Sequence, residues 1–425
     1  MSNFLDELRW RGMLHNHTEE IEEIMNQQHI AGYIGFDPTA PSLTIGNYIQ
    51  VMILHFFQKA GHKPIILMGG ATGRIGDPSG KDKERDLKSY EELDNNLDHQ
   101  VRQFESLLNF KEGPNQAEMV NNLDFYRNMN VLDFLRDVGK SINISYMLAK
   151  DSVKNRLEKG LSFTEFSYQL LQAYDFQCLY QSKNCILQMG GSDQWGNITS
   201  GTEFIRRNLG AKAYAITTPL LTKTDGSKFG KSAEGNIWLD PELTTPYKFY
   251  QFWINADDDD LPKFFRYFSF KNKEEIENLE KEYADNKQQL KKILGEELTT
   301  RIHGKEAFDS VMTVSELLFN KKCNEDFLRK LTSKEWKTLA GEIPSTRVNS
   351  TSLENQLSII DFLSEETGIL NSKSDARRAV QGQAISINKN KVTDIETVIN
   401  KSHLIGEKYM MVENGKKNKY LVEIQ

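Results

Sequence analysis

Two segments far apart in the chain carry residue types suited to polyphosphate chemistry. Lys228 and Lys231 lie three residues apart around a glycine in a polar run, and together they could hold a chain of phosphates. Upstream, residues 38–47 combine hydroxyl side chains with Gly46 where a strand is expected to pass into a helix. The free amides and the dipole of such a helix start attract phosphate. Either segment alone fits ordinary solvated surface, but together they indicate a ligand such as ATP, bound from both sides.

A third group of polar residues has the spacing of one helix face. Tyr168, Gln172 and Asp175 occur at i, i+4 and i+7, which places them within about 60° of one another. A phenol, an amide and a carboxylate on one stripe could solvate the ammonium and the hydroxyl of a small zwitterion. A plain polar helix face is the alternative. The apolar residues around this stretch favour a buried helix, in which polar groups need partners.

Two glycine-rich loops add further polar groups. Within residues 190–197, Asp193 and Gln194 offer an acceptor and an amide to a ribose or a carboxylate. Within residues 71–80, Asp77 could accept from an ammonium. Loops of this composition usually only turn the chain, but here two occur at equivalent places in two strand–helix units.

These groups must be positioned by alternating strands and helices. The apolar patterns predict strand–helix–strand units of a parallel sheet, in which ligands bind at the carboxyl ends of the strands. A G-x-G-x-x-G run is absent from the sequence, which excludes the ordinary dinucleotide fingerprint. The predicted strands are 31–36, 64–68, 185–189 and 214–221, and the predicted helices are 45–60 and 198–209.

The remaining chain divides by composition. Residues 121–159 predict an inserted helical segment, and residues 241–331 are almost wholly helical in pattern. The acidic run 257–260 precedes Leu261 and Pro262, which predicts helix capping rather than a metal site. Residues 333–355 predict a linker, and beyond it short helices at 356–366 and 374–381 alternate with strands at 384–388, 408–412 and 420–424.

Bulk properties limit the class of protein. A chain of 425 residues is too long for one core, and no apolar run is long enough to predict a membrane span. Three cysteines without metal-ligand spacing predict a reduced, cytoplasmic setting. The net charge is −7, yet from residue 371 onward Lys and Arg outnumber Asp and Glu by ten to six. This local +4 indicates RNA contact near the C-terminus, or else a solvated surface.

With these motifs in order, the chain resembles bacterial-type tyrosyl-tRNA synthetases of class I almost from end to end. The most specific match is the Gly-Gly-Ser-Asp-Gln-Trp-Gly-Asn run at 190–197. The segment from about residue 356, above all 372–380 and 382–388, is similar to a small RNA-binding domain shared with a ribosomal protein. The other matching runs are 36–40, 60–64, 69–80, 163–168 and 228–232.

The resemblance implies an α/β fold with three domains and a two-step reaction. Tyrosine and ATP are expected to form tyrosyl-adenylate and pyrophosphate, after which tyrosine is transferred to the 3′-terminal adenosine of tRNA(Tyr). The expected domains are a Rossmann-like parallel-sheet catalytic domain at 1–235 with a helical insertion at about 119–160, an α-helical domain at 236–335, a linker at 336–355 and a small α+β RNA-binding domain at 356–425.

The resemblance also implies roles for individual residues. For tyrosine, Tyr33 and Asp175 are expected at the phenol hydroxyl, Asp77, Tyr168 and Gln172 at the ammonium, and Gln194 near the carboxylate. The residues expected at ATP are Gly35, Asp37, Gly46, Asn47, Gly191, Asp193, Lys228 and Lys231. Catalysis is expected from Thr39, Thr44, Lys228 and Lys231.

One signature departs from the family pattern. The first signature reads His-Ile-Gly-His in generic form, whereas this chain has Thr44 and Asn47 in place of the two histidines. Asparagine can still bond a ribose. Threonine is a shorter, uncharged donor, which shifts stabilisation of the phosphates toward Thr39 and the two lysines.

The resemblance completes the list of expected partners. ATP with Mg²⁺ is expected as co-substrate, without a tightly bound cofactor or a protein metal site. The tRNA is expected on the helical and C-terminal domains, and a homodimer is expected through residues 121–159. Two alternatives stay open, a tryptophan-specific relative and a non-catalytic RNA-binding paralogue. Tyr33 with Asp175 argues against the first, because an indole lacks a phenol-like acceptor, and the second is supported by Thr44 alone.

Overall fold

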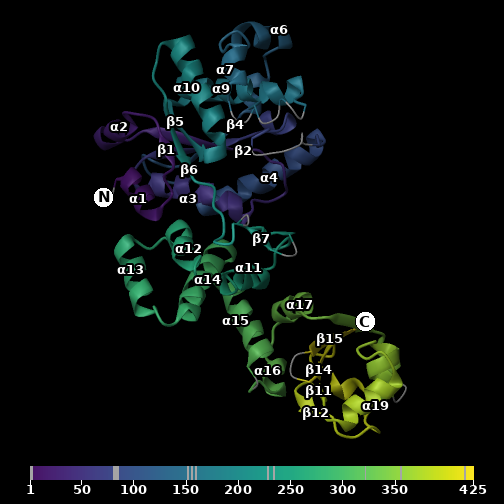
Figure 1. Ribbon diagram of the computed structural model, residues 1–425. Coiled ribbons are helices and arrows are strands. Elements are labelled where there is room, and N and C mark those ends of the chain that lie inside the picture. The colour runs from purple at the N-terminus through teal and green to yellow at the C-terminus, as the bar shows by residue number, and fades with distance from the viewer. Residues whose placement is uncertain are drawn as a thin grey trace. The chain divides into compact units, whose positions relative to one another are not determined.

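The computed structural model describes residues 3–79, 86–150, 153–154, 157, 160–226, 229–232, 235–320, 322–354, 357–415 and 418–425 (Figure 1). The chain forms two compact units. The first unit comprises Met1–Thr244 with Phe252–Leu294, and the second unit comprises Thr245–Gln251 with Gly295–Gln425. These units divide the chain at other residues than 235, 335 and 355, and our domain limits stay a prediction.

The first unit is built on a six-stranded sheet in the order β1-β6-β5-β2-β3-β4. All neighbours are parallel except β1, which is antiparallel to β6. The central strands bury both faces, as parallel sheets covered by helices do. The strands are β1 (Asn16–His17), β2 (Ala31–Phe36), β3 (Lys63–Met68), β4 (Glu118–Asn121), β5 (Cys185–Gly191) and β6 (Tyr214–Thr218). The predicted parallel α/β arrangement is therefore confirmed.

The crossovers run in opposite directions from the centre of this sheet. Helix α3 (Ile45–Lys59) connects β2 to β3, and α10 (Trp195–Leu209) connects β5 to β6. Because such crossovers are right-handed, α3 and α10 cover opposite faces. Helix α9 (Phe163–Lys183) lies beside α10 and packs against β5 (Figure 1). The order reverses between β2 and β5, and the carboxyl ends of these two strands are where ligands bind in such sheets.

Local sequence sets the ends of the two helices that carry site residues. Thr44 caps α3 at its start, and Gly61 follows the helix with φ +95°. Ser162 caps α9 by accepting from the Glu165 amide, and Asn184 ends it in the left-handed region. The other helical segments of the first unit are α1 (Phe4–Arg11), α2 (Ile21–Gln27), η1 (Thr72–Arg74), α4 (Tyr90–Leu107), η3 (Ser192–Gln194), α12 (Leu261–Phe268) and α13 (Lys273–Glu282).

The expected helix over 121–159 is broken into short pieces. Asn130 and Asn143 each turn their side chains onto backbone amides and so begin new helices, which interrupts a continuous one. The pieces are α5 (Leu123–Tyr126), α6 (Val131–Asp133), η2 (Phe134–Val138) and α7 (Ile144–Leu148). Helix α10 also begins at Trp195, three residues earlier than expected.

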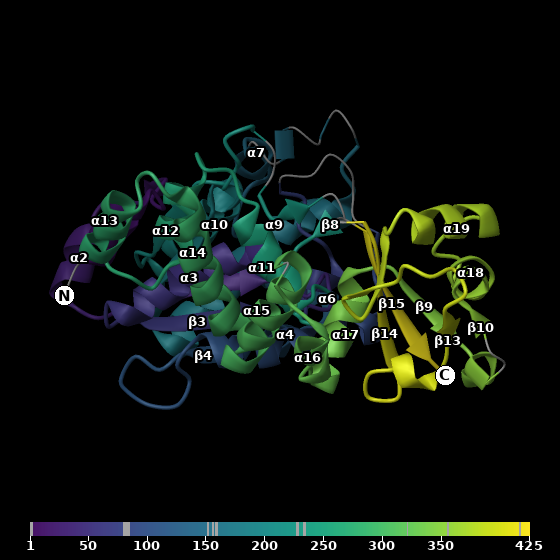
Figure 2. The ribbon, with the colours of Figure 1, turned by 90° about the horizontal axis from the view of Figure 1, so that it is seen from below.

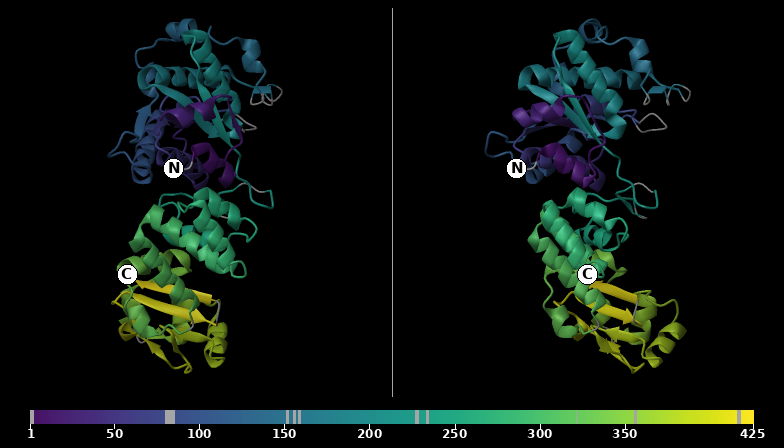
Figure 3. Two further views of the ribbon diagram at one scale, coloured as in Figure 1. Left: turned by 90° about the vertical axis from the view of Figure 1, so that its left-hand side faces the viewer. Right: turned by 60° about the vertical axis from the view of Figure 1, so that its left-hand side comes forward.

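The second unit contains a five-stranded sheet in the order β12-β11-β14-β15-β9, whose strands are drawn yellow to green in Figures 2 and 3. Its strands are antiparallel except for β9, which pairs in parallel with β15. The sheet consists of β9 (Ser345–Val348), β11 (Ile385–Ile387), β12 (Asn390–Lys391), β14 (Tyr409–Asn414) and β15 (Asn418–Ile424), and β10 (Leu357–Ser358) pairs with β13 (Val398–Ile399).

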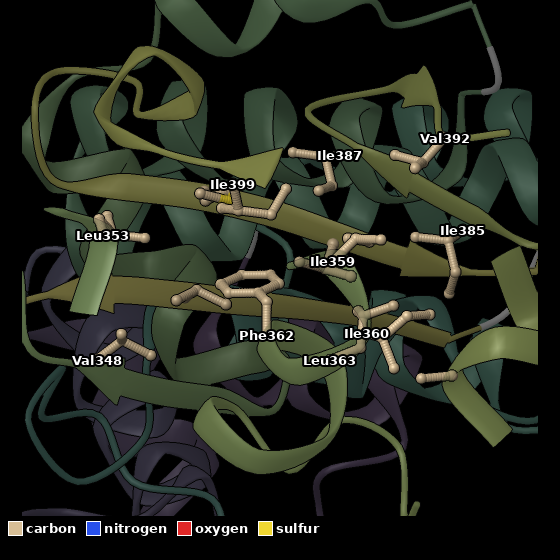
Figure 4. Packing of buried hydrophobic residues seen from close by; sticks show 14 of the residues in the cluster. Val348, Leu353, Ile359, Ile360, Phe362, Leu363, Ile385, Ile387, Val392 and Ile399 are labelled. Atoms are coloured by element: carbon tan, nitrogen blue, oxygen red, sulfur yellow. The ribbon is translucent and has the colours of Figure 1, made fainter. Parts of the chain in front are cut away.

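One apolar core joins this sheet to the helical pieces around it. Ile385 and Ile387 of the sheet pack with Ile359 and Phe362, all nearly inaccessible to solvent (Figure 4). The helical pieces of this unit are α15 (Lys305–Phe319), α16 (Glu325–Arg329), α17 (Ser333–Glu342), η4 (Ser350–Glu354), α18 (Ile359–Asp361), η5 (Phe362–Glu366), α19 (Lys373–Gln381) and η6 (Lys401–His403). Helices α11 (Pro246–Ile254) and α14 (Lys287–His303) include the points where the chain passes between units.

The segment expected to be a linker is regular structure. Thr332 and Glu335 form a capping box that begins α17. Residues 345–348 then add β9 to the edge of the sheet beside β15. The polar residues that predicted a linker here serve as caps and as an edge strand, so this expectation was wrong.

Candidate active site

A cavity of about 340 Å³ opens at the carboxyl ends of β2 and β5, where the strand order reverses. Thr44 and Lys231 are not among its lining residues, and Lys228 lies outside the described residues. The predicted site residues that line it are Tyr33, Gly35, Asp37, Thr39, Gly46, Asn47, Asp77, Tyr168, Gln172, Asp175, Gly191, Asp193 and Gln194. The structure thus brings together thirteen of the residues that the sequence singled out.

Tyr33 and Asp175 are two of the most buried residues that line this cavity. The Tyr33 hydroxyl is fully buried and has no hydrogen-bond partner among the described residues. Burial, and next the nearby Asp175 carboxylate, raise its pKa well above the usual value. Asp175 accepts from the Tyr126 hydroxyl at 2.7 Å and from Asn122 Nδ2 at 2.8 Å. Burial raises the pKa of Asp175 to about 7 even though both hydrogen bonds lower it. A buried hydroxyl without a partner needs one from a ligand.

A chain of hydrogen bonds connects Asp175 to the outer cavity. Asn122 Nδ2 also donates to Thr72 Oγ1 at 2.9 Å, and Thr72 Oγ1 donates to Asp37 Oδ1 at 2.6 Å. The other Asp37 oxygen accepts from the Tyr168 hydroxyl at 2.9 Å. Burial, followed by Asp37 and Asp77, raises the pKa of Tyr168 well above its usual range. Tyr168, expected at an ammonium, is therefore anchored by Asp37.

A second group surrounds Asp77. Its Oδ2 accepts from Gln194 Nε2 at 2.7 Å, and its Oδ1 accepts from the Ser79 amide at 2.9 Å. Gln194 Oε1 in turn accepts from Gln172 Nε2 at 3.5 Å. The side-chain oxygen Oε1 of Gln172 is buried and has no hydrogen-bond partner among the described residues. The Asp77 carboxylate and the Gln172 amide oxygen belong to the same group, and both can accept hydrogen bonds from an ammonium.

The charge of the cavity lining is strongly one-sided. Asp37, Asp77, Asp175 and Asp193 line it, and its described lining residues include no Lys, Arg or His. Burial, and then the neighbouring Asp77, raise the pKa of Asp193. Several carboxylates gathered in a partly buried space favour a cationic group on the ligand. A phosphate chain at this cavity needs cations from outside its described lining.

The start of α3 carries a closed set of bonds. Thr44 Oγ1 donates to Asn47 Oδ1 at 2.7 Å and accepts from the Asn47 amide at 3.2 Å. The Thr44 amide also donates to Asn47 Oδ1 at 3.0 Å. Because Oδ1 accepts from two donors, the other terminal atom of the Asn47 side chain is the amide nitrogen Nδ2. This Nδ2 group makes no hydrogen bond among the described residues. Asn47 lines the cavity and Thr44 does not.

The hairpin that carries Lys231 is attached to this same helix start. Strands β7 (Lys231–Ser232) and β8 (Gly235–Asn236) pair there, and Lys231 is exposed. Gly230 O accepts from the Ile237 amide at 3.0 Å, and Ile237 O accepts from the Ile45 amide at 2.9 Å. Gly230 has φ +82°, and a Cβ there would lie 2.9 Å from Ile45 Cγ2. The two segments with which the sequence analysis began are therefore joined by backbone bonds.

Several residues that contribute to the site were missed from the sequence. Thr72, Asn122 and Tyr126 follow β3 and β4 in the chain, so the rule that parallel strands end at one edge could have indicated the first two. Three glutamines also line the cavity, and their buried Oε1 atoms have no hydrogen-bond partner among the described residues, namely Gln50, Gln100 and Gln188. Nothing in their spacing marked them, because they come from three separate elements.

A parallel sheet with an acidic cavity at its strand reversal, and a lysine hairpin on the first crossover helix, define the catalytic domain of a class I aminoacyl-tRNA synthetase. Residues 25–320 match the family model of class I tRNA synthetases for tryptophan and tyrosine, and residues 335–422 match the C-terminal domain model of tyrosine–tRNA ligases. The chain belongs to the tyrosine–tRNA ligase family.

Individual relatives support this assignment over the full length. The tyrosine–tRNA ligase of Cytophaga hutchinsonii is 50% identical over 426 residues, covering 99% of each chain. That of Amoebophilus asiaticus is 48% identical over 428 residues, covering 100% of both chains. The crystal structure of a C-terminally truncated mitochondrial tyrosyl-tRNA synthetase from Aspergillus nidulans has 30% identity and a TM-score of 0.67, covering 75% of this chain and 95% of that one.

These findings confirm the predicted family, fold class and activity. The protein is an ATP-dependent aminoacyl-tRNA synthetase with tyrosine–tRNA ligase function. The full-length relatives are tyrosine ligases, which disfavours the tryptophan alternative. Among the described helices, none combines the length and apolar character that crossing a bilayer requires.

Proposed function

We propose that this cavity binds L-tyrosine with its phenol between Tyr33 and Asp175. The observation that carries the proposal is the buried Tyr33 hydroxyl, which has no partner within the described part of the chain and lies near the buried Asp175 carboxylate. The substrate hydroxyl donates to Asp175 and accepts from Tyr33. Phenylalanine would leave both groups unpaired, and a discrimination of about 10⁵ against phenylalanine is already known for tyrosyl-tRNA synthetases as a class. Asp77, Tyr168 and Gln172 hold the ammonium, and Gln194 lies near the carboxylate.

In the first step, a carboxylate oxygen of tyrosine attacks the α-phosphorus of ATP and the bond to pyrophosphate breaks. The nucleophile is already ionised, so the step needs no general base. Tyrosyl-adenylate then transfers its acyl group to the 3′-terminal adenosine of tRNA(Tyr), and AMP leaves. Positioning and charge stabilisation supply the acceleration.

The nucleotide lies toward the start of α3. Gly35, Gly46 and Gly191 permit close approach of backbone, and Asp37 and Asp193 lie beside the adenylate and its ribose. Thr39, Lys228 and Lys231 stabilise the phosphates. Because the described cavity lining is acidic, these lysines and the Mg²⁺ that accompanies ATP as co-substrate supply the positive charge. No tightly bound cofactor takes part.

Thr44 acts through Asn47 in this scheme. Its hydroxyl is engaged twice in the capping box, as donor and as acceptor, which leaves it poorly placed to stabilise a phosphate directly. The Asn47 Nδ2 group, oriented by these bonds, donates to the ribose. Thr44 therefore keeps a place in catalysis as the residue that positions Asn47.

The protein works as a homodimer in the cytoplasm. Residues 131–163 expose a group of large apolar side chains, which marks an interaction surface. Replacing Leu132 with Asp should shift the sedimentation coefficient toward that of the monomer, and an unchanged coefficient would argue against this surface. The exposed members are Val131, Leu132, Leu135, Ile144, Leu157 and Phe163.

The tRNA contacts the helical segment and residues 356–425. Lys373, Arg377 and Arg378 lie on or next to one face of α19, Lys391 lies in β12 and Lys401 lies in η6. Phosphate contacts of this kind make binding strongly dependent on salt. Removing the positive charges of Arg377 and Arg378 should weaken tRNA binding without changing ATP–pyrophosphate exchange.

ATP–pyrophosphate exchange measured with each amino acid in turn tests the proposal. Tyrosine alone should support exchange, whereas exchange with tryptophan, or none at all, would refute it. Replacing Lys231 with Ala should slow exchange while equilibrium binding of tyrosine changes little. Lys212→Ala serves as the control, because that lysine pairs with Glu20 and belongs neither to the cavity lining nor to the hairpin. Equal loss of exchange and tyrosine binding in Lys231→Ala would contradict the phosphate role.

A further inference from the structure

The last residue of the acidic run 257–260 does something other than cap its helix. Asp260 is the N-cap residue of α12 and is only 2% exposed, but its side chain makes no capping bond. Its Oδ1 instead accepts from the Thr224 amide at 2.8 Å and from Thr224 Oγ1 at 2.6 Å. The expected capping role was therefore wrong for this residue, since its carboxylate is directed at another part of the chain. Carboxylate bonds of this kind are about twice as strong as neutral ones.

The first turn of α12 holds the same segment a second time. Lys263 Nζ donates to the Thr222 carbonyl at 3.0 Å. Residues 222 and 224 are therefore bound by two side chains of one helical turn. These residues immediately precede the hairpin that carries Lys231, so α12 fixes the arm through which the chain enters it.

Two aromatic residues of α12 contact Phe229, which lies between Lys228 and Lys231 in the sequence. Phe229 is 8% exposed, and its ring centroid lies 5.1 Å from that of Phe264 and 5.3 Å from that of Phe268. Trp253 and Phe252 complete this aromatic group at 6.2 Å and 5.7 Å. The chain is thus anchored to one helix before and after residues 225–228.

Helix α12 is itself fixed within the first unit. The buried Arg11 of α1 donates to the carbonyls of Arg266, Ser269 and Lys271 at 2.6, 3.1 and 2.8 Å. The Tyr267 hydroxyl donates to Gly12 O at 2.8 Å. A helix held at its C-terminal end in this way can serve as a rigid support for the hairpin.

We infer that Asp260 is a positioning residue for the lysine hairpin. By holding Thr224 it sets the path of the chain into the hairpin, so that Lys231 arrives beside the start of α3. It touches no residue of the cavity lining in any described contact, so it acts on the phosphate end of the reaction and leaves tyrosine binding alone. The inference rests on the proposed role of Lys231.

The test compares three variants in ATP–pyrophosphate exchange and in equilibrium binding of tyrosine. Asp260→Ala should lower kcat by about 10- to 100-fold, the cost of small displacements of a group that must be aligned. The KM for tyrosine should stay unchanged. Asp260→Asn keeps an oxygen that can accept from Thr224 and should restore part of the rate. Asp259→Asn is the matched control, because that aspartate is exposed and adjacent but does not contact Thr224.

A double variant separates this inference from the proposed function. If Asp260 acts through Lys231, Asp260→Ala should cost little further rate in a Lys231→Ala background. Full additivity would overturn the inference while leaving the role of Lys231 intact. Loss of tyrosine binding in step with kcat, or a rate equal to that of Asp259→Asn, would also overturn it. A Lys231→Ala enzyme with normal exchange would refute both. Should Asp260→Ala fail to fold, Thr224→Val can replace it. That variant removes only one of the two bonds to Asp260, so kcat should fall by a smaller factor and the KM for tyrosine should again stay unchanged.

Discussion

The pair Thr44 and Asn47 offers the sharpest test of how this site differs from its family signature. We expect Thr44→Ala to remove the donor and the acceptor that fix the Asn47 side chain. The loss of an N-cap should lower the free energy of unfolding by about 1 kcal/mol. The rate should fall only by what Asn47 contributes, because the threonine hydroxyl is already engaged with Asn47 as donor and as acceptor.

The size of the rate effect distinguishes two mechanisms. A single hydrogen bond from Asn47 to the ribose is worth about 0.5–1.5 kcal/mol, which corresponds to a loss of about 2- to 13-fold in kcat/KM for ATP. A threonine that stabilised the transferring phosphate directly would instead cost about 10²- to 10³-fold on removal. The two ranges do not overlap.

The assay is ATP–pyrophosphate exchange with Thr44→Ala, Thr44→Ser, Asn47→Ala and the double Ala variant. Thr44→Ser keeps the hydroxyl and should remain close to the unaltered enzyme. In the Asn47→Ala background, Thr44→Ala should have little further effect on rate, because the two residues act as one unit. A loss above about 100-fold in Thr44→Ala, or additive losses in the double variant, would refute the reasoning.

Three further perturbations follow from the geometry. Tyr33→Phe should lower kcat/KM for tyrosine about tenfold by deleting one bond to the phenol, and an unchanged ratio of tyrosine to phenylalanine activation would contradict that contact. Because the pKa of Asp175 is raised to about 7, kcat/KM for tyrosine should fall about tenfold per unit as pH drops below about 7, and Asp175→Asn should show no such inflection. The same shift means that ionising Asp175 costs stability as pH rises from about 4 to about 7, so urea unfolding of Asp175→Asn should lose that part of the pH dependence. Gly230→Ala should slow exchange more than Gly226→Ala, because both glycines have positive φ but only Gly230 has Ile45 within 4 Å of its Cβ position, and equal effects would show that backbone strain alone is responsible.

The catalytic sheet was predictable because its signals are local. The strand 31–36 and the helix that begins at residue 45 were expected within a residue of where they lie. Apolar runs, a threonine cap and a following glycine are short-range features, and they are readable in one sequence. The helix predicted over residues 121–159 is broken for a related reason. Its apolar periodicity continues throughout, but Asn130 and Asn143 cap new helices within it.

The sequence predicted many of the residues that gather at this cavity, but few of the hydrogen bonds between them. The spacing of Tyr168, Gln172 and Asp175 placed them on one helix face, and the cavity contains all three. The sequence did not indicate that Asp37 binds Tyr168, or that Asn122 connects Thr72 to Asp175. Each of these bonds joins residues at least 50 positions apart.

By itself, the sequence determined a parallel α/β domain, because motif residues and hydrophobic periods are properties of neighbouring positions, and its resemblance to a known family implied a site that activates tyrosine. Only the tertiary structure decided which polar group pairs with which. The bonds between Asp260 and Thr224 illustrate the difference, since local spacing predicted a helix cap and the folded chain offered a partner from another segment. Burial makes an unpaired carboxylate costly, and its partner is whichever donor the packing of distant elements brings within reach.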